Sequence, residues 1–209
     1  MLLVHAVGAV TPVGLDAGQT CASLRAALSG VEARIAQAPP NEPLLAAEVP
    51  ARAELKRHPD RWFVHLAVRA LRECLADFDG DISRLAFVLS VPEIFRAHPA
   101  ITDQTGQALA SRIVGTVGLR FSPHSCVLTM GNAAAAVGLK RVDDLLTRGD
   151  IDGAIVGGVD SLLADADLDR LRDAGRLYLP GHPFGVIPGE GAAFLLIGGS
   201  SRPLNVRPL

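Results

Sequence analysis

The rest of this chain is organised around residues 126–158, CVLTMGNAAAAVGLKRVDDLLTRGDIDGAIVGG. It begins with a short apolar run, turns at Gly131 and Asn132, continues in an alanine-rich helical pattern and ends in a second apolar run. This order predicts a buried strand, a tight turn, a helix and another buried strand. A side chain in the first turn of such a helix lies beside backbone N–H groups that have no partner within the helix. The stretch therefore predicts a position suited to a reactive side chain in the first turn of the helix, although the residue there is Asn132 and not a nucleophilic cysteine.

Apolar runs alternate with helical patterns along the rest of the chain. Further strands are predicted at 2–7, 85–89 and 189–197, and helices at about 15–28, 60–78, 102–117 and 164–174. Strands that are apolar throughout are typical of parallel sheets that are buried on both faces. The sequence therefore predicts an α/β fold, with a mostly parallel five-stranded sheet and helices on both faces.

Two local predictions follow from residue patterns. Cys21 lies on the apolar face of the 15–28 helix, which Asp16 or Thr20 can cap, and we expect this cysteine in the core. Residues 36–59 are expected to form an irregular surface segment, because prolines make a long helix there unfavourable. These prolines are Pro39, Pro40, Pro43, Pro50 and Pro59.

The composition is that of a compact globular protein. The 209 residues are 49% hydrophobic and carry a formal net charge of -2 without any basic cluster, which argues against nucleic acid or an anionic membrane surface as a partner. Cys21, Cys74 and Cys126 are widely spaced, and no ligand spacing indicates a metal site. We expect one domain over residues 1–209, a cytoplasmic location, no cofactor, no metal and no membrane span.

Three motifs carry a family resemblance. Residues 7–14, VGAVTPVG, resemble the opening strand and turn of β-ketoacyl synthases, which are condensing enzymes with the thiolase fold. Residues 150–160, DIDGAIVGGVD, are similar to the family's G-x-x-D-x-A-L-A-G-G-x-E/D strand, and residues 188–192, PGEGA, are similar to its G-E-G-A strand entrance. The order and spacing of the motifs match the first half of such a synthase. The resemblance implies a thiolase-like half.

The resemblance also implies where the site lies and what it lacks. Counting back seventeen residues from Gly149 places the family's nucleophilic cysteine at Asn132, and an amide cannot form the acyl thioester of the condensation reaction. The family's D-x-x-R-D-G-F-V segment is replaced by residues 182–187, and its second half, with two histidines and a lysine, is not matched. The residues expected to line the site are Met130, Gly131, Ala133, Phe184, Gly189 and Glu190.

Asn132 has two interpretations. Asparagine is among the best N-cap residues and can simply start the helix. Alternatively, the resemblance implies that its amide can hydrogen-bond a thioester or malonyl group, because glutamine replaces the cysteine in some related non-condensing subunits and decarboxylating domains. The helix that follows carries a charged stripe opposite its apolar face, which expects water or a polar partner. The stripe consists of Lys140, Arg141, Asp143, Asp144 and Arg148.

Three hypotheses for function follow. The first is a ketosynthase-like protein without the nucleophile, acting as a non-catalytic partner or chain-length-determining subunit in fatty-acid or polyketide synthesis. The second is a malonyl-thioester decarboxylase or thioester hydrolase that uses Asn132, and the third is a non-enzymatic homodimer. The resemblance implies a homodimer, or a heterodimer with a complete ketosynthase, and contact with an acyl carrier protein. The implied dimer edge is Cys126, Val127, Leu128, Thr129 and Met130.

Overall fold

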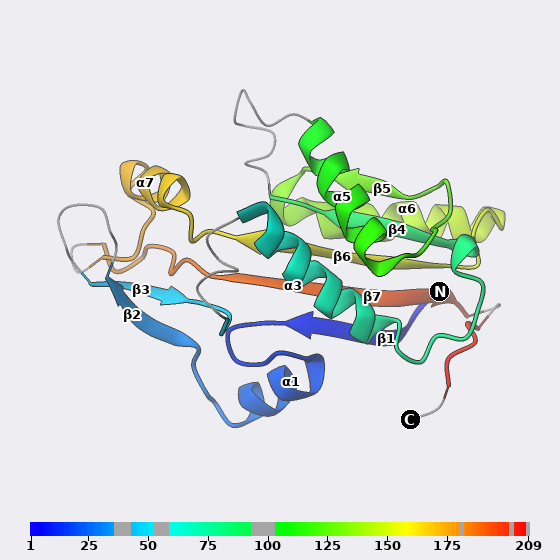
Figure 1. Ribbon diagram of the computed structural model, residues 1–209, viewed down its shortest axis with the longest axis horizontal. Coiled ribbons are helices and arrows are strands. Elements are labelled where there is room, and N and C mark those ends of the chain that lie inside the picture. Colours follow the sequence, from blue (N-terminus) through cyan, green and yellow to red (C-terminus); the bar gives the residue numbers. More distant parts are fainter. Residues whose placement is uncertain (36–42, 52–58, 93–102, 180–181, 201–202, 208–209) are drawn as a thin grey trace.

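The computed structural model describes residues 1–35, 43–51, 59–92, 103–179, 182–200 and 203–207. Apart from the consecutive strands β2 and β3, strands and helices alternate along the described part of the chain, as Figure 1 shows. In chain order they are β1 (Leu2–Val10), α1 (Ala17–Arg25), β2 (Val31–Ile35), β3 (Pro43–Ala47), α3 (Pro59–Cys74), β4 (Leu85–Ser90), α5 (Asp103–Val117), β5 (Cys126–Leu128), α6 (Ala134–Arg148), β6 (Gly153–Ser161), α7 (Asp165–Asp173) and β7 (Glu190–Gly199).

Five strands of the described residues form the main sheet, in the order β1-β7-β6-β4-β5. β4 pairs in parallel with both β5 and β6. β7 is antiparallel to β1 and to β6, so four of the five strands run in the same direction and β7 runs against them. The predicted α/β fold with a mostly parallel five-stranded sheet is confirmed.

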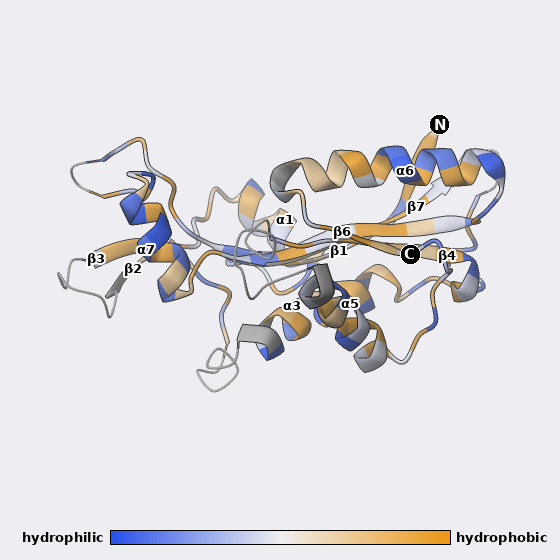
Figure 2. Ribbon diagram, turned by 90° about the horizontal axis from the view of Figure 1, so that it is seen from above, coloured by the Kyte–Doolittle hydropathy of each residue, from blue (hydrophilic) through white to orange (hydrophobic). Residues whose placement is uncertain are grey.

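Helices cover both faces of this sheet, as predicted. α6 lies on one face, and α3 and α5 lie on the other (Figure 2). Under α3 and α5, buried side chains such as Leu66, Leu71 and Phe194 form the larger core cluster. Under α6, Val142 and Leu145 pack in a second cluster with residues of β4 and β6. The short apolar runs of β4 and β6 are therefore buried from both sides, which accounts for their lack of polar alternation.

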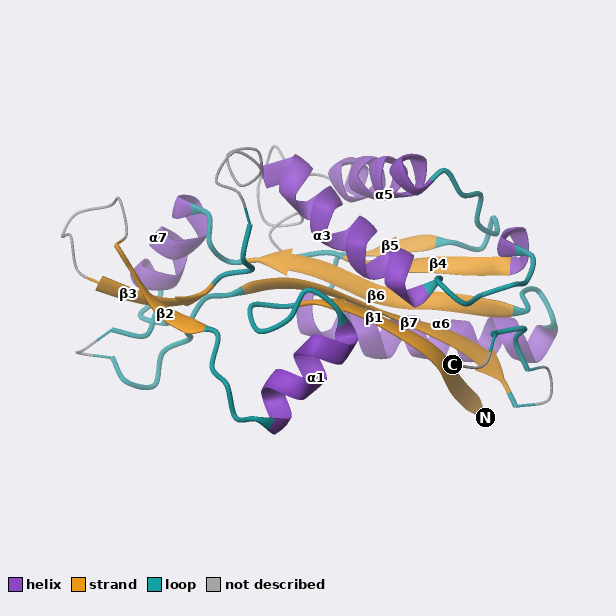
Figure 3. Cartoon of the chain, turned by 60° about the horizontal axis from the view of Figure 1, so that its bottom comes forward, coloured by secondary structure: helices purple, strands orange, loops and turns teal. Residues whose placement is uncertain are grey.

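A small second sheet lies beyond one end of the main sheet (Figure 3). β2 and β3 pair as an antiparallel hairpin, and Leu44 of β3 packs with Leu168, Leu171 and Leu177. The prediction of an irregular segment over residues 36–59 was wrong for β3. Pro43 is the first residue of that strand, a position where a missing N–H is tolerated, so prolines did not exclude a strand.

α1 lies at the rim of the main sheet and buries none of its residues. Asp16 caps it as predicted, since its carboxylate accepts a hydrogen bond from the Gln19 N–H at 2.6 Å. Cys21 is exposed, so its predicted core position was wrong. Hydrogen bonds to a carboxylate, rather than apolar burial, hold the start of α1. Glu73 of α3 accepts hydrogen bonds from the N–H groups of Ala9 and Ala17 at 2.9 and 2.8 Å.

Candidate functional site

The turn between β5 and α6 is the predicted seat of a reactive side chain. A 3-10 turn, η2 (Gly131–Ala133), follows β5, and Gly131 adopts a positive φ of 56° that favours glycine. The turn continues directly into α6, whose N-cap position is Ala133 without a side-chain hydrogen bond. The N-cap position of α6 therefore falls one residue after Asn132, and capping by the Asn132 side chain remains a prediction. The backbone of Asn132 lies in the middle of η2, and its side chain lies outside the described part of the structure.

A cleft of about 370 Å³ opens beside this turn. Its lining comes from the carboxyl ends of β1, β4 and β6, the amino end of β7 and Gly131 of η2. In sheets of this kind, ligands bind beyond the carboxyl ends of the parallel strands. The cleft therefore lies where the fold offers a binding site, and the turn that holds Asn132 forms one of its walls.

Small residues make the floor of the cleft. Ser90 and Gly158 are register partners on β4 and β6. A Cβ atom placed on Gly158 would lie 2.7 Å from the Ser90 carbonyl oxygen and 3.1 Å from the Ser90 Cβ, so any side chain at position 158 would occupy the space above Ser90. The second glycine of the Gly157-Gly158 pair therefore keeps this part of the cleft open.

Polar groups of the cleft differ in what they already contact. The Thr11 hydroxyl lies 3.0 Å from the Thr20 hydroxyl and 3.4 Å from the Gly14 carbonyl oxygen, so its bonding capacity is used within the fold. The Ser90 hydroxyl is buried and has no hydrogen-bond partner among the described residues. Asp160 supplies the single charged side chain of the described lining. Sequence reasoning missed Ser90 and Asp160, although each is a polar residue near the end of an apolar run.

The predicted lining residues are spread over several places. Gly131 lines the cleft, whereas Met130, just before η2, and Ala133, the last residue of η2, are exposed and are not part of the lining. Phe184 is fully exposed. Gly189 bridges to Ala47 of the hairpin. The prediction that these residues line an acyl site remains a prediction.

Glu190, the sixth predicted lining residue, lies inside the protein with 9% of its surface exposed. One carboxylate oxygen accepts a hydrogen bond from the Val49 N–H at 3.0 Å. The other accepts from Trp62 Nε1 at 2.7 Å and from the Ser161 hydroxyl at 3.1 Å. The carboxylate thus joins the segment after β3 to α3, β6 and β7, and the contacts seen are structural.

β5, which contains Cys126, Val127 and Leu128 of the implied dimer edge, is an edge strand of the main sheet, and pairing with another chain there remains a prediction. Its ladder partner is β4, and the Val91 N–H donates to the Leu128 carbonyl oxygen at 3.0 Å. Because successive residues of a strand direct their backbone groups to opposite sides, the N–H and C=O of Val127 point away from β4. No strand of the described residues pairs with that outer side.

Two of the three cysteines are poorly suited to nucleophilic chemistry. Burial raises the pKa of the Cys74 thiol to about 12. Burial also raises the pKa of Cys126 on β5, against the weaker opposing effect of Arg141. Because the thiolate is the nucleophile, a raised pKa makes both thiols less reactive.

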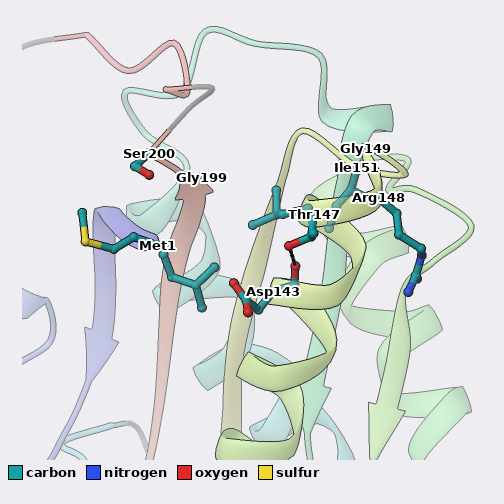
Figure 4. A pocket seen from close by; sticks show the side chains of 10 residues that line it. Met1, Asp143, Thr147, Arg148, Gly149, Ile151, Gly199 and Ser200 are labelled. Carbon is teal, nitrogen blue, oxygen red and sulfur yellow. Dashed lines mark hydrogen bonds between the residues drawn. The ribbon is translucent and has the colours of Figure 1, made fainter.

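The charged stripe of α6 is exposed on this chain, as predicted. Lys140 pairs with Asp144 at 3.0 Å, and Arg148 pairs with Asp150 at 2.8 Å. At the carboxyl end of α6, a separate hollow of about 310 Å³ lies between the helix and the ends of β1 and β7 (Figure 4). In this hollow the Thr147 hydroxyl donates a hydrogen bond to the Asp143 carbonyl oxygen at 2.8 Å. The carboxyl ends of β4 and β6, which shape the first cleft, do not line this hollow.

The described residues offer neither a metal site nor a membrane-spanning helix. No group of three His, Cys, Asp or Glu side chains gathers there to hold a metal ion. No helix in the described ranges is long and apolar enough to cross a bilayer. Asp167 and Asp169 belong to α7, where Asp167 pairs with Arg170 at 2.9 Å and Asp169 pairs with Arg172 at 2.7 Å.

The fold is that of ketosynthases. The chain is similar to a ketosynthase from module 6 of the bacillaene synthase of Bacillus subtilis 168, with 14% identity and a TM-score of 0.66 over 96% of this chain and 40% of that chain. It is also similar to a type II polyketide synthase ketosynthase bound to the hexaketide and in complex with its acyl-carrier protein, with 15% identity and a TM-score of 0.71. The ishigamide ketosynthase/chain length factor gives 19% identity and a TM-score of 0.68.

The last two matches each cover 96% of this chain and 58% of the other chain. The chain therefore spans about 40–58% of the length of these three structures. No protein-family model and no curated protein matches the sequence. At these identities the comparisons establish the thiolase-like ketosynthase fold over one part of such a protein.

Proposed function

We propose that the chain is a ketosynthase-like subunit without a nucleophile, which acts as a non-catalytic partner or chain-length-determining subunit in fatty-acid or polyketide synthesis. The observation that carries this proposal is Asn132, which lies in the turn between β5 and α6, at the wall of the cleft beyond the strand ends. The family resemblance puts the nucleophilic cysteine at this position. An amide there cannot accept the growing acyl chain as a thioester.

The comparisons support a partner role by analogy. One similar structure is described as a ketosynthase/chain length factor, and another as a ketosynthase in complex with its acyl-carrier protein. In this proposal the chain pairs with a complete ketosynthase, which supplies the cysteine, and the pair receives its substrate from an acyl carrier protein. The chain contributes shape and contacts near the acyl group, while the condensation chemistry belongs to its partner.

The outer side of β5 is the proposed pairing edge. It is short, lies at the edge of the main sheet and leaves the backbone groups of Val127 directed outward. An unpaired edge of this kind is a template for strand addition by another chain. Pairing there continues the sheet across the interface and places the turn at Asn132 close to the partner.

Co-expression tests this proposal. A tagged form of the chain is expressed with each complete ketosynthase of the same genome, and we expect one of them to co-purify at a one-to-one ratio. Val127→Pro removes the outward N–H and leaves the β4 ladder intact, because proline is accepted where the N–H faces away from the sheet. We expect this variant to lose at least about tenfold in affinity for the partner, the equivalent of ~1.4 kcal/mol.

Val127→Ala is the matched control, since it shortens the same side chain and keeps the N–H. Alkylation of Cys126 gives a second readout, because pairing along β5 should slow its modification in the complex while exposed Cys21 still reacts. Co-purification that Val127→Pro leaves unchanged removes β5 as the interface. A chain that forms only a homodimer, with no ketosynthase bound, supports the non-enzymatic homodimer and contradicts the proposal.

A further inference from the structure

The outer face of α3 carries a row of basic side chains, which we call the basic row. It consists of Arg61, His65, Arg69 and Arg72, each of which is exposed. Residues that recur every three or four positions lie on one face of a helix. α3 covers the face of the sheet opposite α6 (Figure 2), and its buried residues, such as Leu66, belong to the core beneath it. The basic row therefore faces away from the sheet.

The arginines of the basic row are held in place without being neutralised. Arg69 Nε donates a hydrogen bond to the Leu15 carbonyl oxygen at 2.7 Å, and Arg72 donates to the Thr116 carbonyl oxygen at 3.4 Å. Both acceptors are neutral backbone groups, so they orient the guanidinium groups and leave their charge in place. Neither these two arginines nor Arg61 forms an ion pair with a carboxylate of the described residues.

Two carboxylates of this region accept hydrogen bonds from backbone N–H groups instead. Glu73 of α3 accepts from Ala9 and Ala17, and Asp16 accepts from Gln19. Four other arginines of the described residues do pair with a carboxylate, namely Arg84, Arg148, Arg170 and Arg172. The basic row is therefore a concentration of positive charge that the described part of the chain does not offset.

This arrangement is unfavourable for the chain alone. Arg61 lies in the first turn of α3, where the positive end of the helix dipole disfavours a cation. Arg69 and Arg72 are like charges three residues apart, which destabilises a helix. Burial lowers the pKa of His65, and the charge of Arg69 lowers it further. A partner that brings negative charge to this face would offset these costs.

The shape of the basic row favours an elongated partner of limited length. Arg61 and Arg72 are about 16 Å apart along the axis, at about 1.5 Å per residue. Carboxylates that recur every three or four residues on another helix have the same spacing. Asp77, Asp79 and Asp81 follow the end of α3, and a longer anionic polymer such as a nucleic-acid strand would meet their repulsion.

We propose that the basic row of α3 is a docking surface for an acidic helix of a partner protein, whose carboxylates pair with Arg61, Arg69 and Arg72. The inference rests on the charges of this row and does not depend on the proposed function. The surface is also separate from the proposed pairing edge, because α3 packs on β1 and β7 whereas β5 lies at the opposite edge of the sheet. One chain can therefore hold both kinds of partner at once.

Fluorescence anisotropy with two synthetic peptides tests the inference. Both are alanine-rich helices of the same composition. In the acidic-face peptide the glutamates recur every three or four residues, and in the scrambled peptide they point to all sides of the helix. We expect the acidic-face peptide to bind the chain at least about fivefold more tightly than the scrambled peptide. Its affinity should fall as the salt concentration rises.

Three variants connect this binding to the basic row. Arg61→Gln combined with Arg69→Gln should weaken binding of the acidic-face peptide at least about fivefold, because two ion pairs are lost. Arg25→Gln removes an exposed arginine from α1 and should stay within about twofold of the wild-type affinity. Arg61→Gln alone should melt at the wild-type temperature or above it, because it removes a cation from the first turn of a helix.

A reversal of charge separates docking from any effect on folding. Arg61→Glu combined with Arg69→Glu should no longer bind the acidic-face peptide. It should instead bind the corresponding peptide with lysine in place of each glutamate, which the wild type does not bind. A damaged fold would not produce this exchange of preference.

Equal binding of the acidic-face and scrambled peptides by the wild type, or binding that the double glutamine variant leaves unchanged, overturns the inference. So does the absence of binding, and so does tighter binding of single-stranded DNA than of the acidic-face peptide. These failures leave the proposed function standing, because co-purification with a ketosynthase tests β5. A chain that binds the acidic-face peptide through α3 but joins no ketosynthase contradicts the proposed function alone.

Discussion

Glu190→Ala should lower the free energy of unfolding by about 4 kcal/mol. Its carboxylate accepts hydrogen bonds from Val49, Trp62 and Ser161, and the residue is 9% exposed. Alanine leaves these donors buried without an acceptor, and each unsatisfied group costs about 1–3 kcal/mol. The loss also releases the contact between the segment after β3 and the main sheet. Urea unfolding followed by tryptophan fluorescence measures the effect, because Trp62 is the single tryptophan of the sequence.

Two further variants separate the carboxylate from a general loss of volume. Glu190→Gln keeps one acceptor oxygen but turns an amide toward a donor, so we expect it to lose about 2 kcal/mol. Glu32→Ala removes an exposed carboxylate from β2 and should stay within about 0.5 kcal/mol of the wild type. If the free energy of unfolding of Glu190→Ala lies within about 1 kcal/mol of the wild-type value, the carboxylate does not hold these segments together.

Gly8→Ala should destabilise the fold by about 3 kcal/mol. Gly8 lies where β1 packs against the backbone of α3, and a Cβ atom there would clash with the Ala70 carbonyl oxygen and lie 2.7 Å from the Cys74 nitrogen. Both neighbours are backbone atoms of a buried helix, so neither can turn aside as a flexible side chain would. α3 would have to move away from the sheet, which loosens the packing between α3 and β1.

The control for this change is Gly115→Ala in α5. A Cβ atom on Gly115 meets nothing within 4 Å, and alanine is favoured over glycine in a helix interior by about 0.5–1 kcal/mol. Thermal unfolding of the two variants should therefore shift in opposite directions. If Gly8→Ala melts with the wild type, the contact between β1 and α3 is looser than the structure shows.

Much of the fold could be predicted because it follows from local patterns. The apolar runs of β4 and β6 and the amphipathic pattern of α6 specify their own structure. Gly8 and Gly158 belong to the motifs that carried the resemblance, and the structure gives each a physical reason, since a side chain would meet backbone atoms of α3 or β4. At both positions, the glycine that belongs to the motif is also the residue that the packing requires.

The candidate site was harder to predict because it is assembled from distant segments. Ser90 and Gly158 are 68 residues apart in the chain and become neighbours only through the pairing of β4 with β6. Glu190 belongs to a motif, yet its partners Val49 and Trp62 lie more than 100 residues away, so its structural role was not visible in the sequence. Cys21 lies on the apolar face that the helical pattern predicted, but α1 lies at the rim of the sheet and none of its residues is buried.

The proposed function implies that this chain performs no acyl chemistry by itself. The most direct test incubates it with malonyl- and acyl-loaded carrier protein, alone and with the ketosynthase that co-purifies, and follows both acyl groups by mass spectrometry. We expect that the chain alone neither decarboxylates the malonyl group nor hydrolyses either thioester above the protein-free blank, and that Asn132→Ala behaves identically. Condensation should require the partner's cysteine, with products whose length distribution changes when the chain is added. Decarboxylation or hydrolysis by the chain alone, abolished by Asn132→Ala, would contradict the proposed function.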